Sequence, residues 1–321
     1  MAKAEPRVSV LVRAYNVEPW IEQCLESILS QQTSFAVEIL VHDDASTDGT
    51  PAILHRYVEQ YPDQISVVFQ TTNQHGQGLN PASPLVAMAR GQFLALCDGD
   101  DYWIDPRKLQ IQVDRLDGDS SLSIVMNQSD LLEGDTLKPR SGNGESRYQL
   151  RHFVKQMAVG SASSSILCRH TPEIRVDFSG AGLHDNTGAD WLLCVSALKS
   201  GELCFLHRSM SIYRIRPRSL YSTKSWVDQF KVHIHSALTV SVILNDRWRS
   251  QILNINKRRL LLRWVNSAEP EEAACIRKEF CKIESNALLR WLANRAMRSS
   301  LKKAYGNHIS KIFYWKLAIA S

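Results

Sequence analysis

Three carboxylates follow an apolar run in this sequence, and they are the residues best placed to do chemistry. Asp98, Asp100 and Asp101 come directly after the apolar residues 93–97. Carboxylates this close together repel one another unless a cation lies among them, and hard oxygen ligands favour Mg²⁺ or Mn²⁺. Such a motif is a weak signal by itself, because an acidic turn that caps the following helix has the same composition.

A second pair of carboxylates occupies an equivalent position. Asp43 and Asp44 close the run 38–41 and precede a turn-forming segment, 45–51. Turn chemistry explains the serine, aspartate and glycine of that segment, but two adjacent carboxylates there only add repulsion. Ligands of open α/β sheets bind at the carboxyl ends of parallel strands, so both acidic clusters are expected in one pocket.

The elements that position these residues alternate along the first 120 residues. Apolar runs and amphipathic segments at this spacing predict βαβ units and a mostly parallel sheet flanked by helices. Strands are expected at 8–12, 37–41, 65–69 and 93–97, and helices at 18–30, 51–61, 84–90 and from 105 to about 116. The pattern is mixed in the next hundred residues, with strands expected at 122–132, 161–168, 203–206 and 209–213, a polar loop at 138–147 and a helix at 190–199.

Charge and composition bound the class of protein. The chain has 321 residues, 44% of them hydrophobic, and the seven cysteines contain no C-x-x-C pair, which argues against disorder, a zinc site and a disulfide framework. No apolar stretch approaches the length of a membrane span, and the start lacks a signal peptide pattern, so a cytoplasmic location is expected. Residues 1–120 hold 8 basic against 17 acidic side chains, whereas residues 221–321 hold 18 against 7.

Five segments in order resemble the motifs of the inverting family-2 glycosyltransferases with a GT-A fold. They are VSVLVRAYN at 8–16, EILVHDDASTDGTP at 38–51, GQFLALCDGDDYWIDP at 91–106, ADW at 189–191 and SIYR at 211–214. The resemblance implies an α/β GT-A catalytic domain over 1–220, with a nucleotide-sugar-binding half at about 1–120 and an acceptor-binding half at about 121–220. Residues 221–321 are then a basic, helical C-terminal region.

The resemblance also implies roles for the donor site. Tyr15 is expected to pack against the nucleobase, and Asp44 to accept a hydrogen bond from its ring N–H. Asp98 is expected to hold the ribose. Asp100 or its neighbour Asp101 is expected to hold a Mn²⁺ or Mg²⁺ ion that bridges the diphosphate of the donor, and the sequence leaves the choice between them open.

Asp190 occupies the family's catalytic base position. Inversion requires a base on the side of the sugar opposite the leaving group, where it takes the proton of the acceptor hydroxyl. Asp190 also begins the helix expected at 190–199, and a helix cap is compatible with the base role.

The sequence departs from the family pattern at three places. Arg13 stands where the family commonly has proline, and the segment 74–78 lacks the basic residue often found near the donor phosphates. Related sequences often carry a histidine soon after the Tyr-Arg pair, whereas this chain has Arg214, Arg216 and Arg218. Arg216 is predicted to bind the diphosphate, with an ordinary solvated basic strand as the alternative.

The last part of the chain, 285–321, has seven basic residues and no acidic one, with aromatic residues interleaved. This pattern suits an anionic membrane surface that presents a lipid-linked acceptor, although a helical cover with a solvated basic face has the same pattern. Nucleic acid is not expected as a partner, because no recognition motif accompanies the charge.

The sequence therefore predicts an enzyme that transfers a single sugar from a nucleotide-sugar donor, a UDP-sugar being favoured, to a saccharide or lipid-linked hydroxyl acceptor. By analogy with its family, the pathway is bacterial polysaccharide assembly. Two alternatives stay open: a sugar-nucleotide-binding scaffold without turnover, and a metal-dependent nucleotidyltransferase that releases pyrophosphate.

Overall fold

The computed structural model describes residues 5–140, 142–156, 162–179 and 188–216, with scattered positions between 240 and 254. The chain divides into two units, Met1–Thr223 and Lys224–Ser321. The elements below belong to the first unit. The domain boundary predicted at residue 220 and most of the region expected to be helical beyond it lie outside the described residues.

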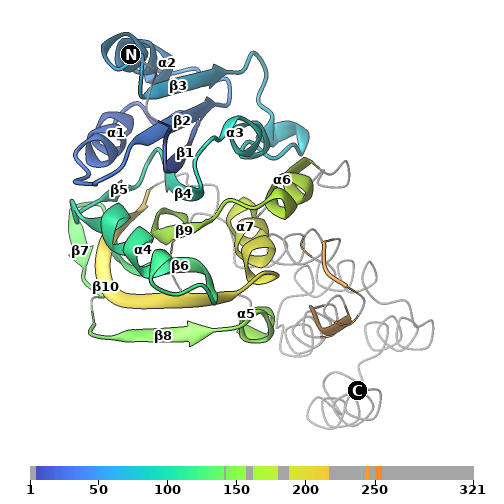
Figure 1. Cartoon of the computed structure of the whole chain (residues 1–321). Helices are drawn as coiled ribbons and strands as arrows, with labels where there is room; N and C mark the ends of the chain where they lie inside the picture. Colours follow the sequence, from blue (N-terminus) through green and yellow to red (C-terminus); the bar gives the residue numbers. More distant parts are fainter. Residues whose placement is uncertain are drawn as a thin grey trace, which may run out of the picture. The chain divides into compact units, whose positions relative to one another are not determined.

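The first half of this unit is a parallel sheet built from βαβ steps. The strands are β1 (Val8–Ala14), β2 (Val37–Asp43), β3 (Ile65–Phe69) and β4 (Phe93–Asp98). The connecting helices are α1 (Ile21–Leu29), α2 (Thr50–Gln60) and α3 (Ser83–Met88), with the short 3₁₀ turn η1 (His75–Gln77) before α3. β1 lies between β2 and β4 and is parallel to both, as predicted, and β3 follows outside β2 (Figure 1).

The second half extends the same sheet and mixes strand directions. Its strands are β5 (Tyr102–Trp103), β6 (Leu122–Glu133), β7 (Thr136–Lys138), β8 (Glu145–Tyr148), β9 (Ile166–Arg169) and β10 (Glu202–Ile215). Its helices are α4 (Lys108–Asp117), α5 (Leu150–Gln156), α6 (Pro172–Ser179) and α7 (Ala189–Leu198), with the 3₁₀ turn η2 (Ser163–Ser165) before β9. The strand order is β3-β2-β1-β4-β9-β6-β10-β5, and β9 is antiparallel to both of its neighbours.

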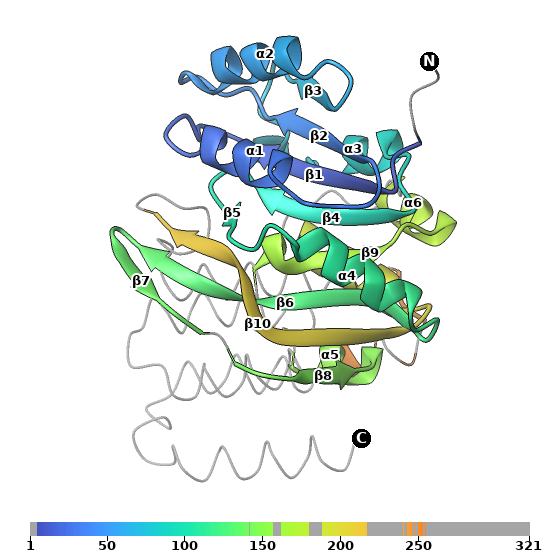
Figure 2. The ribbon, with the colours of Figure 1, turned by 60° about the vertical axis from the view of Figure 1, so that its left-hand side comes forward.

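The helices cover both faces of this sheet (Figure 2). One core cluster joins α1, α2 and α4 to side chains of β1, among them the fully buried Val8, Val10 and Val12. On α1 the buried residues are those that the helical spacing predicts, Ile21, Cys24, Leu25 and Ile28. On the other face α3 packs on α6, and α6 on α7. Within the described residues, no helix is long and apolar enough to cross a membrane.

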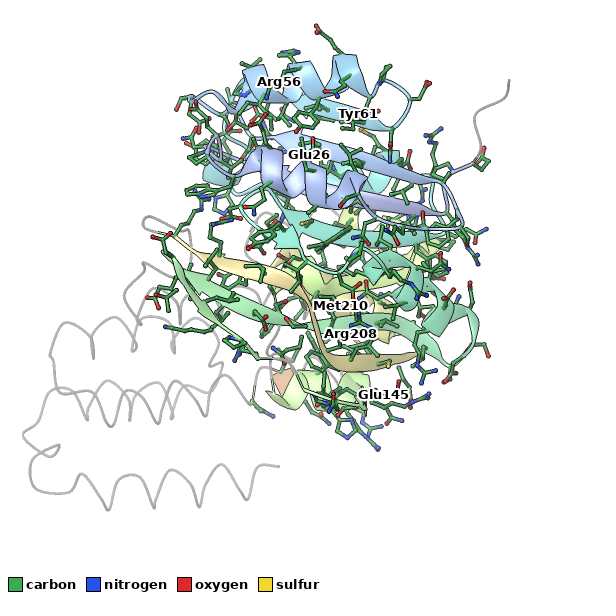
Figure 3. The ribbon with its side chains drawn as sticks, turned by 90° about the vertical axis from the view of Figure 1, so that its left-hand side faces the viewer. Glu26, Arg56, Tyr61, Glu145, Arg208 and Met210 are labelled. Atoms are coloured by element: carbon green, nitrogen blue, oxygen red, sulfur yellow. The ribbon has the colours of Figure 1, made fainter. Side chains whose placement is uncertain are left out.

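Three of the expected strands differ from the structure. The strand expected from 161 to 168 is replaced by η2 over Ser163–Ser165, before β9. The hydroxyl of Ser165 donates to the nearby Ala162 carbonyl, and that of Ser163 donates to Asp98, and these hydrogen bonds favour a turn. The two strands expected at 203–206 and 209–213 are the single strand β10, which stays paired with β6 through shifts in register. Arg208 and Met210 lie on this continuous strand (Figure 3).

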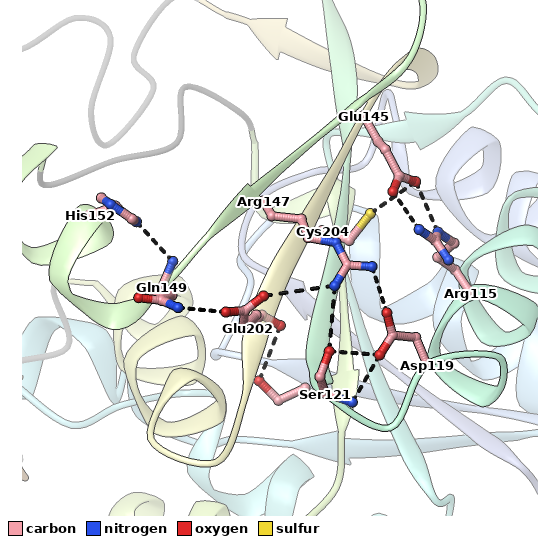
Figure 4. A network of polar contacts seen from close by, with 10 residues as sticks. Arg115, Asp119, Ser121, Glu145, Arg147, Gln149, His152, Glu202 and Cys204 are labelled. Carbon is pink, nitrogen blue, oxygen red and sulfur yellow. Dashed lines mark hydrogen bonds and ion pairs between the residues drawn. The ribbon is translucent and has the colours of Figure 1, made fainter.

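β8 overlaps the end of the segment 138–147, which the sequence predicts to be a polar loop. Its backbone pairs with β10, and its charged side chains pair with other segments (Figure 4). Glu145 binds Arg115 of α4, and Arg147 binds Asp119 at 2.5 Å. These ion pairs and the backbone ladder hold a strand that has little apolar surface to bury.

Candidate active site

The acidic clusters lie at one edge of the sheet because the strands that carry them pair in register. Ala14 of β1 is opposite Asp43 of β2, and Arg13 is opposite Asp98 of β4. Two backbone hydrogen bonds continue the ladder past the strands, from Asp44 N–H to the Ala14 carbonyl and from Gly99 N–H to the Arg13 carbonyl, each 2.9 Å long. The loops after β1, β2 and β4 therefore emerge side by side.

Asp98 is held by a bidentate ion pair with Arg13. Nε of Arg13 lies 2.7 Å from Oδ1 of Asp98, and Nη2 lies 2.8 Å from Oδ2. The hydroxyl of Ser163 in η2 also donates to Oδ2, at 2.5 Å. Burial would lower the pKa of Arg13, but the adjacent Asp98, then Asp190 and Asp100, keep it raised. Arg13 is thus a fixed cation at the floor of the site.

Asp100 is paired with an arginine from the end of β10. Nε of Arg216 lies 2.6 Å from Oδ2 of Asp100, and the two side chains are only 17% and 19% exposed. The guanidinium also lies over the ring of Trp20, 5.0 Å from its centroid. Burial raises the pKa of Asp100, and the charge of Asp98 raises it further, whereas Arg216 lowers it.

Asp101 points into the protein. It is 1% exposed, and its Oδ1 accepts the backbone N–H of Arg214 at 2.9 Å. Burial raises its pKa well above the usual aspartate range, and the charges of Asp100 and Asp98 add to this. Buried and bonded to the backbone of β10, Asp101 holds the acidic loop against that strand.

Asp44 is buried and holds the loop that follows β3. Its carboxylate oxygens accept the backbone N–H groups of Gln74, at 2.6 Å, and His75, at 3.0 Å. Tyr15, by contrast, is 38% exposed in the loop that follows β1. Asn16, in the left-handed region with φ 50°, ties the two loops together, since its Oδ1 accepts the N–H of Thr47 at 2.8 Å.

Asp190 is the second residue of α7 and belongs to the same electrostatic environment. Its Oδ1 accepts the N–H of Trp191 at 2.9 Å, but the cap position is Gly188, so the helix cap considered for Asp190 in the sequence is wrong because the helix begins one residue earlier, at Ala189. Burial raises the pKa of Asp190, the charge of Arg13 opposes the rise, and the charge of Asp98 adds to it. The pKa of Tyr213 is also raised, by burial and then by the charges of Asp101, Asp100, Asp98 and Asp190.

Comparison with known proteins identifies the family. The sequence profile described as Glycosyl transferase family 2 matches residues 9–178, which is more than half of the chain. The chain belongs to glycosyl transferase family 2.

Proteins from several bacteria match parts of this family-2 chain. The uncharacterized protein Rv1520 of Mycobacterium tuberculosis is 31% identical over 64% of this chain and 58% of its own length. The putative glycosyltransferase EpsH of Bacillus subtilis is 34% identical over 48% of this chain and 44% of its own length. The chain thus spans little more than half the length of the first of these relatives.

Solved structures show that this family-2 chain has the GT-A fold. TarS 1–349 of S. aureus, in complex with UDP-GlcNAc, has a TM-score of 0.64 and 18% identity over 97% of this chain and 92% of its own. The mannosyltransferase PcManGT of Pyrobaculum calidifontis, in complex with GDP-Man and Mn²⁺, has a TM-score of 0.54 and 18% identity over 98% of this chain and 86% of its own. The fold class predicted from the sequence is confirmed.

The residues predicted for the donor site of this family-2 chain lie around the ends of β1, β2, β4 and β10, and Asp190 lies on α7. Their roles stay predictions. The sequence did not indicate the hydrogen bond from Ser163 to Asp98 or the contact between Arg214 and the acidic loop, in which Nε of Arg214 donates to the Asp100 carbonyl at 2.9 Å. Arg13 stands out in the sequence only as a departure from the family pattern. A basic residue inside an apolar strand was the available signal, because such a group needs a buried partner.

Proposed function

We propose that this chain is an inverting glycosyltransferase that moves one sugar from a nucleotide-sugar donor, a UDP-sugar being favoured, to a hydroxyl acceptor. The observation that carries the proposal is the shared cation of the site. The charges of Asp98, Asp100 and Asp190 all act on the guanidinium of Arg13. This supports one site for the candidate base and the candidate donor loop.

Tyr15 and Asp44 are proposed to bind the nucleobase. Tyr15 is exposed in the loop that follows β1, where its ring can stack on a base. Asp44 already accepts two backbone N–H groups, and a carboxylate has lone pairs for a further hydrogen bond from a ring N–H. The UDP-GlcNAc complex of TarS supports a uridine donor, and the GDP-Man complex of PcManGT is the reason to test guanosine as well.

Asp98 and Asp100 are proposed to hold the ribose and the metal. Arg13 and Ser163 fix the orientation of Asp98, whose remaining lone pairs can accept a ribose hydroxyl. Of the two candidate metal ligands, Asp100 fits a hard cation better, because Asp101 is buried and bonded to the backbone of β10. Within the described ranges, no three His, Cys, Asp or Glu side chains form an arrangement that could hold a metal ion.

The cation is therefore proposed to bind through Asp100 together with the donor diphosphate. A Mn²⁺ or Mg²⁺ ion there would supply Lewis-acid stabilisation of the negative charge on the leaving group. Arg216, which binds Asp100 at 2.6 Å, is close enough to the same position to bind the diphosphate.

Asp190 is proposed to be the catalytic base. It takes the proton of the acceptor hydroxyl while the hydroxyl oxygen attacks the anomeric carbon, and the nucleoside diphosphate leaves from the opposite side, so the configuration inverts. Burial raises the pKa of Asp190 towards the values that make a carboxylate an effective base. The acceptor is proposed to be a saccharide or a lipid-linked glycan. The segment 285–321, proposed to bind the inner face of an anionic membrane, lies outside the described residues.

The test removes the base without removing the donor site. Asp190→Asn should lower transfer by about two to four orders of magnitude, the usual contribution of a general base. UDP binding, measured by titration calorimetry, should change little. Asp114→Asn, on the outer surface of α4, makes the same chemical change and should behave like the wild type. Transfer by Asp190→Asn near the wild-type rate would exclude this base.

The same assay separates the alternatives. A transferase releases nucleoside diphosphate when sugar appears on the acceptor, whereas a nucleotidyltransferase releases pyrophosphate. A scaffold would bind the nucleotide sugar and release neither product with any acceptor.

A further inference from the structure

An arginine already occupies the carboxylate that is proposed to hold the metal. Arg216 binds Oδ2 of Asp100, and more than four fifths of both side chains is shielded from water. Among the described residues, no other side chain makes a hydrogen bond or ion pair with Oδ1 of Asp100. The acidic loop thus has a cation of its own before any donor arrives.

The attachment of Arg216 is looser than that of its neighbour on β10. Arg214 makes three hydrogen bonds to surrounding elements: its N–H to Asp101 at 2.9 Å, its Nε to the Asp100 carbonyl at 2.9 Å, and its Nη2 to Gln23 at 2.7 Å. These contacts fix the backbone of β10 against the acidic loop whatever the side chain of Arg216 does.

Among the residues that the structure describes, Arg216 makes one ion pair, with Asp100. Its other contacts are the face of Trp20, at 5.0 Å from the ring centroid, and a long hydrogen bond to the Asn16 carbonyl, at 3.4 Å. An arginine side chain has several rotatable bonds, so the guanidinium can leave Asp100 while the strand stays in place.

Two cations cannot occupy one buried carboxylate without repulsion. We propose that Arg216 is the counter-ion of Asp100 before the donor binds. When the divalent cation binds Asp100, the guanidinium of Arg216 leaves this carboxylate and binds the donor diphosphate. The inference rests on the proposed donor site and adds a competition between Arg216 and the divalent cation for Asp100. Because the arginine needs a new anionic partner, the cation alone binds weakly, and cation and nucleoside diphosphate bind cooperatively.

The test measures Mn²⁺ binding by electron paramagnetic resonance, which needs no turnover. In Arg216→Ala, Mn²⁺ alone should bind at least about tenfold more tightly than in the wild type, because its competitor is gone. UDP and GDP are each titrated into both proteins in saturating Mn²⁺. The nucleotide that binds the wild type should bind Arg216→Ala at least about tenfold more weakly. Opposite changes for the cation and the nucleotide distinguish this competition from a general loss of structure.

Two further variants serve as controls. Arg208→Ala removes a positive charge from the same strand, where Arg208 pairs with Asp105 at 2.5 Å, and should leave Mn²⁺ affinity unchanged (Figure 3). Arg216→Lys keeps the charge and should keep the weak Mn²⁺ binding of the wild type. Thermal unfolding of each variant checks that it is folded.

A Mn²⁺ affinity of Arg216→Ala equal to or below that of the wild type overturns the inference, whether or not the nucleotide binds. If Asp100→Asn then abolishes Mn²⁺-dependent nucleotide binding, the proposed donor site stands and only the competition is wrong. If neither Mn²⁺ nor nucleotide binds any folded variant, the donor site fails with it.

Discussion

The ion pair between Arg13 and Asp98 should contribute measurably to stability, and its size follows from its geometry. Replacing Arg13 by Met keeps much of the aliphatic bulk and removes the guanidinium, which leaves Asp98 close to Asp100 and Asp190 without a counter-ion. Breaking a buried pair from one side costs about 3–5 kcal/mol. Because the two side chains are 23% and 26% exposed, solvent screens part of this loss, and we expect about 2–3 kcal/mol.

The assay is urea unfolding of Arg13→Met, Asp98→Asn and the double variant. If the two groups interact as the bidentate contact indicates, the double variant should lose less than the sum of the single losses, by at least about 1 kcal/mol. Arg56→Met is the matched control, because Arg56 on α2 pairs with Glu22 while both side chains are more than half exposed (Figure 3). That change should cost less than about 1 kcal/mol.

Two results would refute the reasoning. A loss in Arg13→Met no larger than that in Arg56→Met would mean that the pair does not hold the acidic loop. Additive losses in the double variant would mean that the two side chains stabilise the fold independently.

Two pH dependences follow from the same region. Transfer should decline, as pH falls, at a higher pH than an ordinary aspartate would give, because burial raises the pKa of Asp190. In Arg13→Met the decline should move to still higher pH, since the opposing charge is lost; a pH profile of kcat that stays in place or moves down contradicts this. Burial also lowers the pKa of Lys108 to about 7 from its ordinary 10.5, so unfolding takes up a proton between these values and stability should rise with pH there. In Lys108→Met this rise in stability should vanish, and denaturant midpoints at pH 7 and 10 measure it. An equal rise in the wild type and in Lys108→Met would assign the pH dependence to another group.

The parallel half of the fold could be predicted because its pattern is local. β3 has the predicted bounds, and β1, β2 and β4 extend the predicted strands only at their carboxyl ends. Helix starts were less accurate. α1 and α4 each begin three residues after the expected start, at Ile21 and Lys108, because Pro19 and Pro106 lie in turns that precede these helices. α2 begins one residue before the expected start, at Thr50.

The elements missed by the sequence prediction depend on distant partners. β8 reads ESRY, which has no apolar alternation, and it is a strand because β10 offers a backbone ladder and Arg115 and Asp119 offer charges. The site shows the same division. The ends of the predicted strands indicated that Asp44, Asp98 and Asp100 lie close together. The hydrogen-bond partners of these carboxylates, however, come from residues 30 to 116 positions away in the sequence. Only the register of the sheet brings these partners together.

The charged side chains of β8 have a consequence for how copies of this molecule meet. An unpaired strand edge is a template on which another chain can add a strand and begin to aggregate. β8 pairs with Leu203–Leu206 of the long strand β10. Its Glu145 forms an ion pair with Arg115 of α4, and its Arg147 forms one with Asp119 in the turn after α4. A second chain that approached this edge would have to strip water from these charges and displace their partners. β8 therefore makes accidental strand pairing along β10 costly, and salt that screens its charges lowers that barrier.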